Sequence, residues 1–132
     1  ETLLRQQALA PEARPEHIAA YGACLAAQGK RREFGMLLRW AEARGVTPET
    51  YLNLGVLASE GFGDLKSAER AVSEALRLRP GYRDALVALA RILERQGRWS
   101  GAEAAWRQVL MADPDDPEAR QGLEAVWRAR PR

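Results

Sequence analysis

The amino-acid sequence predicts an all-α fold in which antiparallel helix pairs are stacked side by side. Packing residues return after 34 positions, so that Ala68 recurs as Ala102 and Pro80 as Pro114. Within each unit, apolar residues follow one another at spacings of three and four, which places them on one face of a helix. A repeat of this length is typical of stacked supersecondary units, each covering the apolar face of its neighbour.

The recurrence has one irregularity. Leu54-Gly55 recurs as Leu89-Ala90, one position late, because residues 59–63 hold one extra residue. Small residues recur where the two helices of a pair would meet, and a bulky side chain there would force the helices apart. The expected positions of close approach are Gly55, Ala68, Ala90 and Ala102.

Each expected helix begins and ends at residues that favour helix termini. Thr47-Pro48-Glu49 combines a side-chain cap, a proline at the first helical position and an acid in the first turn. Asp116-Pro117-Glu118 repeats this pattern. Glycines that can adopt the left-handed conformation mark the expected turns, at Gly29, Gly45, Gly61 to Gly63, Gly81 and Gly97. The expected helices are residues 2–10, 15–28, 31–44, 48–60, 65–79, 82–96, 99–112 and 117–130.

The units resemble the tetratricopeptide repeat (TPR), a helix-turn-helix of 34 residues. The family pattern is Trp-x-x-Leu-Gly-x-x-Tyr, followed by Ala-x-x-x-Phe and then Pro. One unit matches with Leu86, Leu89-Ala90, Leu93, Ala102, Trp106 and Pro114, and the preceding one with Tyr51, Leu54-Gly55, Ala68, Val72 and Pro80. The resemblance implies a TPR-like α-solenoid, a right-handed superhelix of antiparallel helix pairs.

An earlier unit departs from the family pattern. Ile18, Tyr21-Gly22 and Leu25 match its first helix, but Phe34 stands where the family has a small Ala, and no Pro falls at the expected end. We therefore expect Phe34 to push this unit out of the ideal geometry.

Residues 1–132 are expected to form a single TPR domain. It would comprise the end of a preceding helix or partial repeat (1–14), a divergent repeat (15–47), two further repeats (48–81 and 82–115) and a C-terminal capping helix (116–132). In the cap, Leu123, Val126 and Trp127 are expected to pack on the preceding repeat, while the other side faces water.

Composition is ordinary for a globular domain, with 29% charged residues, 46% hydrophobic residues and a net charge of +2. No apolar stretch approaches the length that spans a bilayer. Lysine occurs only at Lys30 and Lys66 among 20 basic residues, which we interpret as a GC-rich, bacterial coding sequence. The chain begins with Glu1 rather than Met, so we expect a fragment. Its location is left open between the cytoplasm and a membrane anchor facing the cytoplasm or periplasm.

No residue pattern supports an enzyme, a metal site or a cofactor. Cys24 lies seven residues after His17, the single histidine, which is roughly 10 Å along a helix and too far for a base and its nucleophile. Cys24 is expected to be a buried structural thiol. Asp113, Asp115 and Asp116 lack the Glu that completes a calcium loop, and are expected to form a cap and a solvated loop.

The resemblance also implies where a partner would bind, because in the family the first helix of each repeat lines a concave face. The inward positions would be Glu16, Ala19, Ala20, Ala23, Ala26 and Ala27; then Glu49, Leu52, Asn53, Val56, Ser59 and Glu60; then Asp84, Val87, Ala88, Arg91, Glu94 and Arg95. The expected partner-binding groove is Glu49, Leu52, Asn53, Val56, Asp84, Val87, Arg91 and Arg95. The alternative is that its Ala and Val residues only pack neighbouring repeats.

These observations favour a non-catalytic protein–protein interaction scaffold whose groove binds a helix or an extended peptide segment of another protein. Family analogy suggests a bacterial envelope assembly, a secretion system or an exopolysaccharide export complex. One alternative is a regulatory or oligomerisation segment of a larger enzyme or membrane machine, which leaves a homo-oligomer open. Nucleic-acid binding is not expected, because Lys30-Arg31-Arg32 is a short cluster that we interpret as a solvated turn. A chaperone carboxylate tail is not expected either, because Glu16, Glu49 and Asp84 would repel it.

Overall fold

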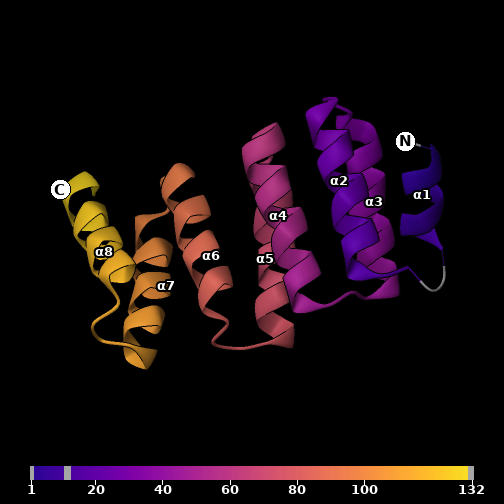
Figure 1. Cartoon of the computed structure of the whole chain (residues 1–132). Helices are drawn as coiled ribbons and strands as arrows, with labels where there is room; N and C mark the ends of the chain where they lie inside the picture. The colour runs from indigo at the N-terminus through magenta and orange to yellow at the C-terminus, as the bar shows by residue number, and fades with distance from the viewer. Residues whose placement is uncertain (1, 11–12, 131–132) are drawn as a thin grey trace.

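The computed structural model describes residues 2–10 and 13–130, which form eight α-helices and contain no strand (Figure 1). The prediction of an all-α fold is confirmed, and each helix lies within two residues of its expected bounds. The helices are α1 (Thr2–Leu9), α2 (Pro15–Ala27), α3 (Arg31–Arg44), α4 (Pro48–Phe62), α5 (Leu65–Leu78), α6 (Arg83–Arg95), α7 (Trp99–Ala112) and α8 (Pro117–Ala129).

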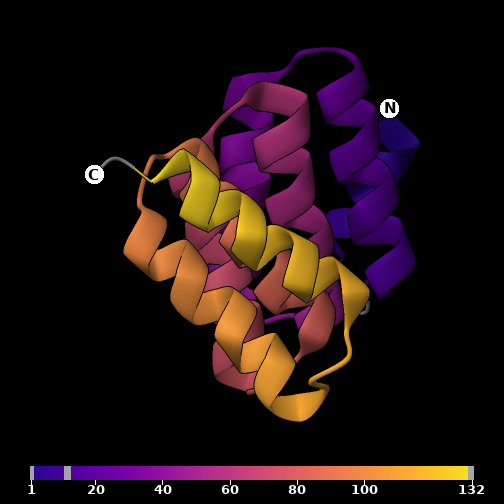
Figure 2. The ribbon, with the colours of Figure 1, turned by 90° about the vertical axis from the view of Figure 1, so that its left-hand side faces the viewer.

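The helices form one elongated array of antiparallel pairs. The pairs α2–α3, α4–α5 and α6–α7 follow one another along it, and α1 and α8 lie at its opposite ends (Figure 1). Viewed from the C-terminal end, α8 is the outermost helix and lies alongside α7 (Figure 2). Each pair therefore packs mainly on its immediate neighbours, which is the arrangement of a helical repeat protein.

The helix ends follow the expected chemistry, with one correction. The Thr47 side chain accepts a hydrogen bond from the Thr50 amide (3.2 Å). Helix α4 does not end at residue 60 but continues through Gly61 to Phe62, and Gly63 ends it in the left-handed conformation (φ 64°). The extension fits the packing, because a Cβ on Gly61 would lie only 3.1 Å from the Ala26 methyl group of α2.

The two helices of a pair meet where side chains are smallest. A Cβ placed on Gly55 would lie 2.7 Å from a methyl group of Val72 and 3.2 Å from the Ala68 carbonyl oxygen, both on α5. Ala90 and Ala102 hold the corresponding place between α6 and α7 and are fully buried. The small residues singled out in the sequence therefore do permit close helix crossings.

Helix α6 joins two apolar cores. The first extends from α1 to one side of α6, where it includes Ala85 and Ile92. The second lies between the other side of α6 and helices α7 and α8, and includes Leu86 and Leu93 from α6. Because α6 contributes to both cores, it is held from two sides.

The first pair is packed differently from the other two. Helix α2 contacts α4 more extensively than it contacts its own partner α3, whereas α4 with α5 and α6 with α7 form the most extensive contacts of the array. Phe34 of α3 is buried and meets the Phe62 ring of α4 at 5.0 Å between centroids. A bulky residue at this position thus accompanies a looser pair, as the sequence predicted.

Arg31 is exposed, as expected of a solvated residue, but it begins α3 and its side chain contacts α4. Its guanidinium donates a hydrogen bond to the Phe62 carbonyl oxygen (2.7 Å) and lies over the Phe62 ring at 5.7 Å. It therefore satisfies one of the carbonyl groups that the end of α4 leaves without a helical partner.

Helix α8 packs on α7 through a narrow face. Leu123 and Val126 are buried as expected. Trp127 is not, since 51% of it is exposed and its indole N–H donates to Glu103 (3.3 Å). The closest approach lies at Gly122, where a Cβ would stand 2.3 Å from the Trp106 indole. The lack of a side chain at Gly122 allows α8 to lie on Trp106.

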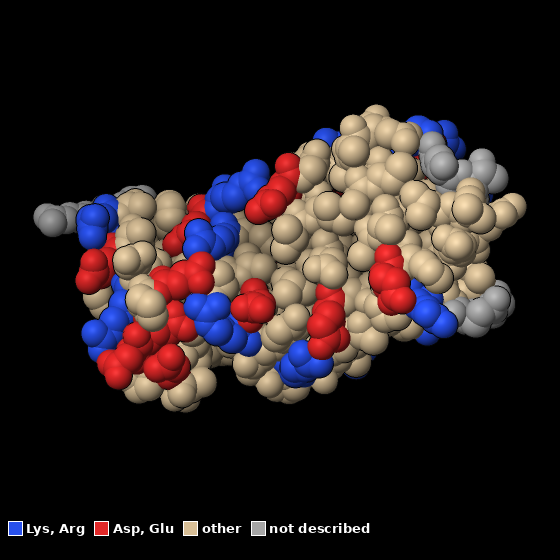
Figure 3. All heavy atoms as spheres, in the orientation of Figure 1, with Lys and Arg blue, Asp and Glu red and all other residues tan. Residues whose placement is uncertain are grey.

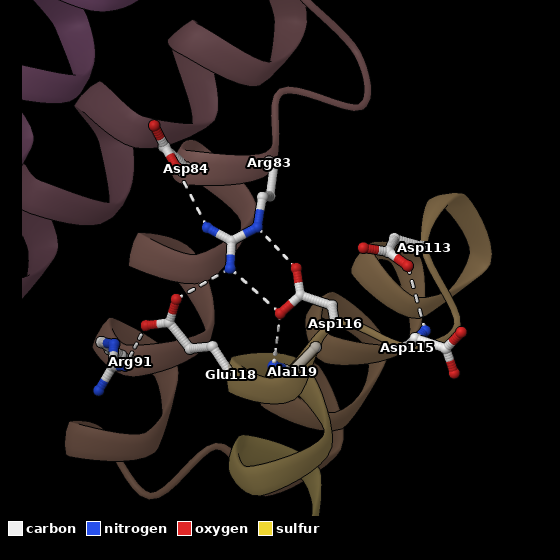
Figure 4. A network of polar contacts seen from close by, with 8 residues as sticks. All are labelled: Arg83, Asp84, Arg91, Asp113, Asp115, Asp116, Glu118 and Ala119. Carbon is white, nitrogen blue, oxygen red and sulfur yellow. Dashed lines mark hydrogen bonds and ion pairs between the residues drawn. The ribbon is translucent and has the colours of Figure 1, made fainter.

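A polar clasp made by Arg83, Arg91, Asp116 and Glu118 ties α8 to α6 (Figure 4). Arg83 binds both carboxylate oxygens of Asp116 (2.7 and 3.1 Å) and also donates to Glu118 (2.9 Å). Asp116 is buried, and it caps α8 by accepting from the Ala119 amide (3.1 Å). These contacts hold the pKa of Asp116 below its usual range, chiefly because Arg83 stabilises the charged form.

Ala102→Leu should lower the free energy of unfolding by about 1–3 kcal/mol, because it overpacks the crossing between α6 and α7. Ala104 is exposed two residues further along the same helix, so Ala104→Leu is the matched control and should change stability by less than about 0.5 kcal/mol. Urea denaturation followed by circular dichroism measures both variants. Equal midpoints would contradict the packing described for α7.

Gly122→Ala should lower the free energy of unfolding by about 1–3 kcal/mol, because its methyl group would collide with the Trp106 indole. Gly35 provides a control of opposite sign. It is helical, and a Cβ added there would have no atom within 4 Å, so Gly35→Ala should stabilise the protein by about 0.5–1 kcal/mol. Thermal unfolding of both variants tests the docking of α8, which an increased melting temperature for Gly122→Ala would contradict.

Asp116→Asn should destabilise the protein at neutral pH and much less in acid. Asparagine keeps a capping oxygen but loses the charge that Arg83 binds. The pKa of Asp116 in the folded state is below its ordinary value of 3.8. Its carboxylate therefore stabilises the fold fully above that value, and this contribution is lost as the pH falls through the lower folded-state pKa.

Urea unfolding of the wild type and Asp116→Asn between about pH 7 and about pH 3 measures this dependence. The difference between the two midpoints should shrink toward the acid end of the range. A difference that stays constant would show that the charge of Asp116 does not contribute to holding α8.

Candidate functional site

A cleft of about 460 Å³ lies between α4 and α6. Its floor is aliphatic, formed by Leu52, Val56, Val87, Ala88 and Ile92. The cleft opens here because α4 and α6 contact one another less extensively than α2 and α4 do. Of these five residues, Val56 and Ala88 are half-buried, and the other three are buried.

The structure brings six of the eight predicted groove residues together around this cleft. Leu52 and Val56 come from α4, whereas Asp84, Val87, Arg91 and Arg95 come from α6. The remaining inward positions of these two helices that line the cleft are Ser59, Glu60, Ala88 and Glu94. That these residues bind a partner remains a prediction.

Two predicted groove residues do not line the cleft. Asn53 is exposed on α4, outside it. Glu49, in the first turn of α4, is ion-paired with Arg79. Hydrogen bonding to its own backbone and to Arg79 lowers the pKa of Glu49. The inward positions of α2 are also absent from the lining, so the cleft involves only two of the three pairs.

Val87 has a second role that the sequence did not separate from the first. It is only 8% exposed and belongs to the second core, between α6 and helices α7 and α8. Val56 is half-buried and is the more accessible of the two valines. The lining residue that sequence reasoning missed is Ile92, which also packs in the first core. Its apolar side chain is the only signal that the sequence offered.

Both arginines of the cleft are engaged. Arg91 pairs with Glu118 of α8 and lies over the Trp106 ring at 5.8 Å. Arg95 donates to the Ser59 hydroxyl (2.7 Å) and approaches the Ser59 carbonyl oxygen (3.3 Å). Arg91 is thus held by helices α7 and α8, and Arg95 by helix α4.

Charged side chains are unevenly distributed on this face of the array. They gather over α6, α7 and α8, whereas the face of α2 and much of α4 carries few (Figure 3). The site therefore borders an apolar surface on one side and a highly charged one on the other.

The other candidate residues lie outside the cleft. No group of three His, Cys, Asp or Glu side chains in the described part of the chain is placed to hold a metal ion. Asp113 accepts a hydrogen bond from the Asp115 amide (3.1 Å), so it orders the loop before α8. Cys24 is half-buried rather than buried as expected, and its sulfur accepts a hydrogen bond from Gln28 (3.1 Å). None of the described helices combines the length and the apolar character needed to cross a membrane.

Two curated proteins match about half of this chain at 39% identity. One is human protein O-mannosyl-transferase TMTC2, matched over 62 residues, which are 47% of this chain and 7% of that protein. The other is cellulose synthase operon protein C of Pseudomonas fluorescens (strain SBW25), matched over 61 residues, which are 46% of this chain and 5% of that protein. The chain thus corresponds to a small part of each relative.

Solved structures share the fold at low sequence identity. The second TPR domain of human RPAP3, in complex with an HSP70 peptide, has a TM-score of 0.63 at 17% identity and covers 86% of this chain and 98% of its own. The Yersinia enterocolitica type III secretion chaperone SycD, in complex with a peptide of the translocator YopD, has a TM-score of 0.62 at 17% identity. The match covers 86% of this chain and 92% of the SycD chain.

A family model described as tetratricopeptide repeat matches residues 61–126, which are half of the chain. The matched segment includes the end of α4, all of α5 to α7 and most of α8, and thus one wall of the cleft. On this match and on the shared architecture, the chain belongs to the tetratricopeptide repeat family.

Proposed function

We propose that this chain is the non-catalytic interaction segment of a larger protein, and that it binds an apolar segment of a partner protein in the cleft between α4 and α6. The single observation that carries the proposal is the aliphatic floor of that cleft, where Val56 and Ala88 are partly exposed, flanked by charged side chains from both helices. Apolar grooves of this kind suit a helix or a peptide whose side chains bury against the floor.

The coarser part of this function follows from the family. The chain is a protein–protein interaction scaffold, because it has the TPR fold and structures of this fold hold peptides of other proteins. Tetratricopeptide repeats are in general interaction modules without catalytic groups of their own. We propose the same for this chain, with the repeats at residues 15–47, 48–81 and 82–115 and the cap at 116–132.

A bacterial envelope assembly that exports a polysaccharide is the setting we propose. The similarity to cellulose synthase operon protein C supports this context. The bacterial secretion chaperone with a related fold shows that the architecture also serves secretion, although at 17% identity it carries only the fold.

A regulatory or oligomerisation segment of a larger enzyme is the second candidate. The match to a protein O-mannosyl-transferase favours it, because there a chain of this kind corresponds to 7% of a protein named for its enzymatic activity. The two candidates differ in the occupant of the cleft, which is a separate protein in the first and another part of the same protein or a second copy in the second.

The C-terminal carboxylate of a chaperone is not the partner we propose. Such a ligand needs free cationic groups in the groove, and both Arg91 and Arg95 already have partners. Glu60 and Asp84 line the same cleft and would repel a carboxylate.

Val56→Glu should weaken binding of the native partner by about tenfold or more, because it places a charge on the floor of the cleft. Val56 is half-buried, so the change should leave the helical content intact. Val87 is a poor site for this test, since it is nearly buried in the core. The partner would be recovered from the source cells with the wild-type chain, and its affinity measured by calorimetry.

Ala104→Glu, on the exposed side of α7, is the matched control and should bind as the wild type does. Circular dichroism of both variants separates a loss of binding from a loss of fold. If Val56→Glu binds the partner normally, the cleft is not the binding site.

A further inference from the structure

We propose that the cleft between α4 and α6 selects a cationic amphipathic helix, with apolar side chains facing the floor and a Lys or Arg near each end of the bound stretch. The inference rests on the proposed function, because it names the chemistry of the segment that the same cleft would bind. The charge balance of the cleft and the positions of its carboxylates carry it.

The cationic groups of the cleft are already neutralised or fixed by the protein itself. Arg91 is ion-paired with Glu118, and Arg95 is held by the hydroxyl and the carbonyl oxygen of Ser59. A partner's carboxylate could bind either guanidinium only by displacing or sharing an existing contact. Arg91 therefore contributes little attraction for an acidic ligand, whereas Arg95 keeps its charge and is offset in the lining only by the neighbouring carboxylates Glu60 and Glu94.

The carboxylates of the cleft, by contrast, are only partly neutralised. Glu60 has no hydrogen-bond or ion-pair partner within the described residues. Among the described residues, the Glu94 carboxylate accepts a hydrogen bond only from the Trp106 indole N–H (3.2 Å), which is a neutral donor. Asp84 pairs with Arg83 (3.2 Å), but that guanidinium is shared with two further carboxylates of the clasp. The lining is thus locally acidic on a chain whose net charge is +2.

These carboxylates lie at both ends of the apolar floor. Glu60 and Glu94 are near the C-terminal ends of α4 and α6, whereas Asp84 is in the first turn of α6. Asp84 and Glu94 are ten residues apart on one helix, which corresponds to about 15 Å along its axis. A helix laid along the cleft would meet them with cationic residues that are themselves about ten positions apart.

The walls of the cleft favour a helix over an extended strand as the occupant. Both walls are helices whose backbone groups are bonded within the helix, so they offer no free ladder to an extended chain. A helix satisfies its own backbone and presents only side chains, which suits an aliphatic floor with charges at its ends. Complementary charge would then set the orientation and the rate of association.

The test is selection from a defined library against the whole chain. The probe is a displayed library of helical peptides of about 18 residues, with Leu at the apolar positions and Lys, Glu or Gln at the others. Peptides selected on the wild type should be enriched in Lys over Glu at two positions about ten residues apart. The dissociation constant of the best peptide should rise about 3–10-fold in the double variant Glu60→Gln with Asp84→Asn.

Glu33→Gln on the exposed side of α3 removes one negative charge outside the cleft and is the control, which should leave that dissociation constant unchanged. Val56→Glu should abolish capture of the selected peptides. Selected peptides that are acidic or unbiased in charge, but still lost with Val56→Glu, would overturn this inference and leave the proposed function standing. Recovery of no peptide, or of peptides that bind Val56→Glu normally, would contradict both.

Discussion

The close approach of the two helices within a pair is the constraint on which the rest of the structure depends. Gly55 brings α4 against the backbone of α5 at Ala68, and small residues do the same between α6 and α7. Larger residues are then buried on either side of each crossing, which leaves one face of the pair for its neighbour. The first pair shows the converse, since it has the bulky Phe34 at the repeat position of Ala68 and Ala102, and α2 contacts α4 more extensively than it contacts α3.

The cleft follows from the same arrangement. Helix α6 is held between two apolar cores, so its position is set by both neighbouring pairs and not by α4 alone. It contacts α4 over a limited stretch, and Val56 and Ala88 stay partly exposed between the two helices. A binding surface on rigid helices requires little ordering when a partner arrives, which limits the entropic cost of association.

Much of the fold was predictable because its signals are local. Caps such as Thr47 and left-handed glycines such as Gly63 act within one turn of the chain, so the helix ends could be placed from sequence alone. The 34-residue recurrence then located the helix crossings, and the family resemblance located most of the cleft lining.

What could not be predicted depends on how helices far apart in sequence are placed. Gly122 gives no local sign that an indole lies against it, and Trp127 looks like a core residue until α8 is positioned with its outer side uncovered. Arg31 and Arg83 carry the same charge, but their partners lie about thirty residues further along the chain. Arg31 binds a backbone carbonyl group, whereas Arg83 binds a carboxylate. Ile92 lines the cleft because α4 and α6 contact one another over only a limited stretch.

Glu118 connects the last helix of the array to the surface of the cleft, and this has a thermodynamic consequence. Its carboxylate belongs to α8, yet it neutralises Arg91 on the wall of α6. A ligand that displaces Glu118 from Arg91 weakens the attachment of α8, whereas a ligand that leaves this pair intact does not. Because such coupling is reciprocal, the contacts that hold α8 reduce the binding free energy of an anionic ligand at Arg91. The reduction equals the free energy by which that ligand weakens the attachment of α8.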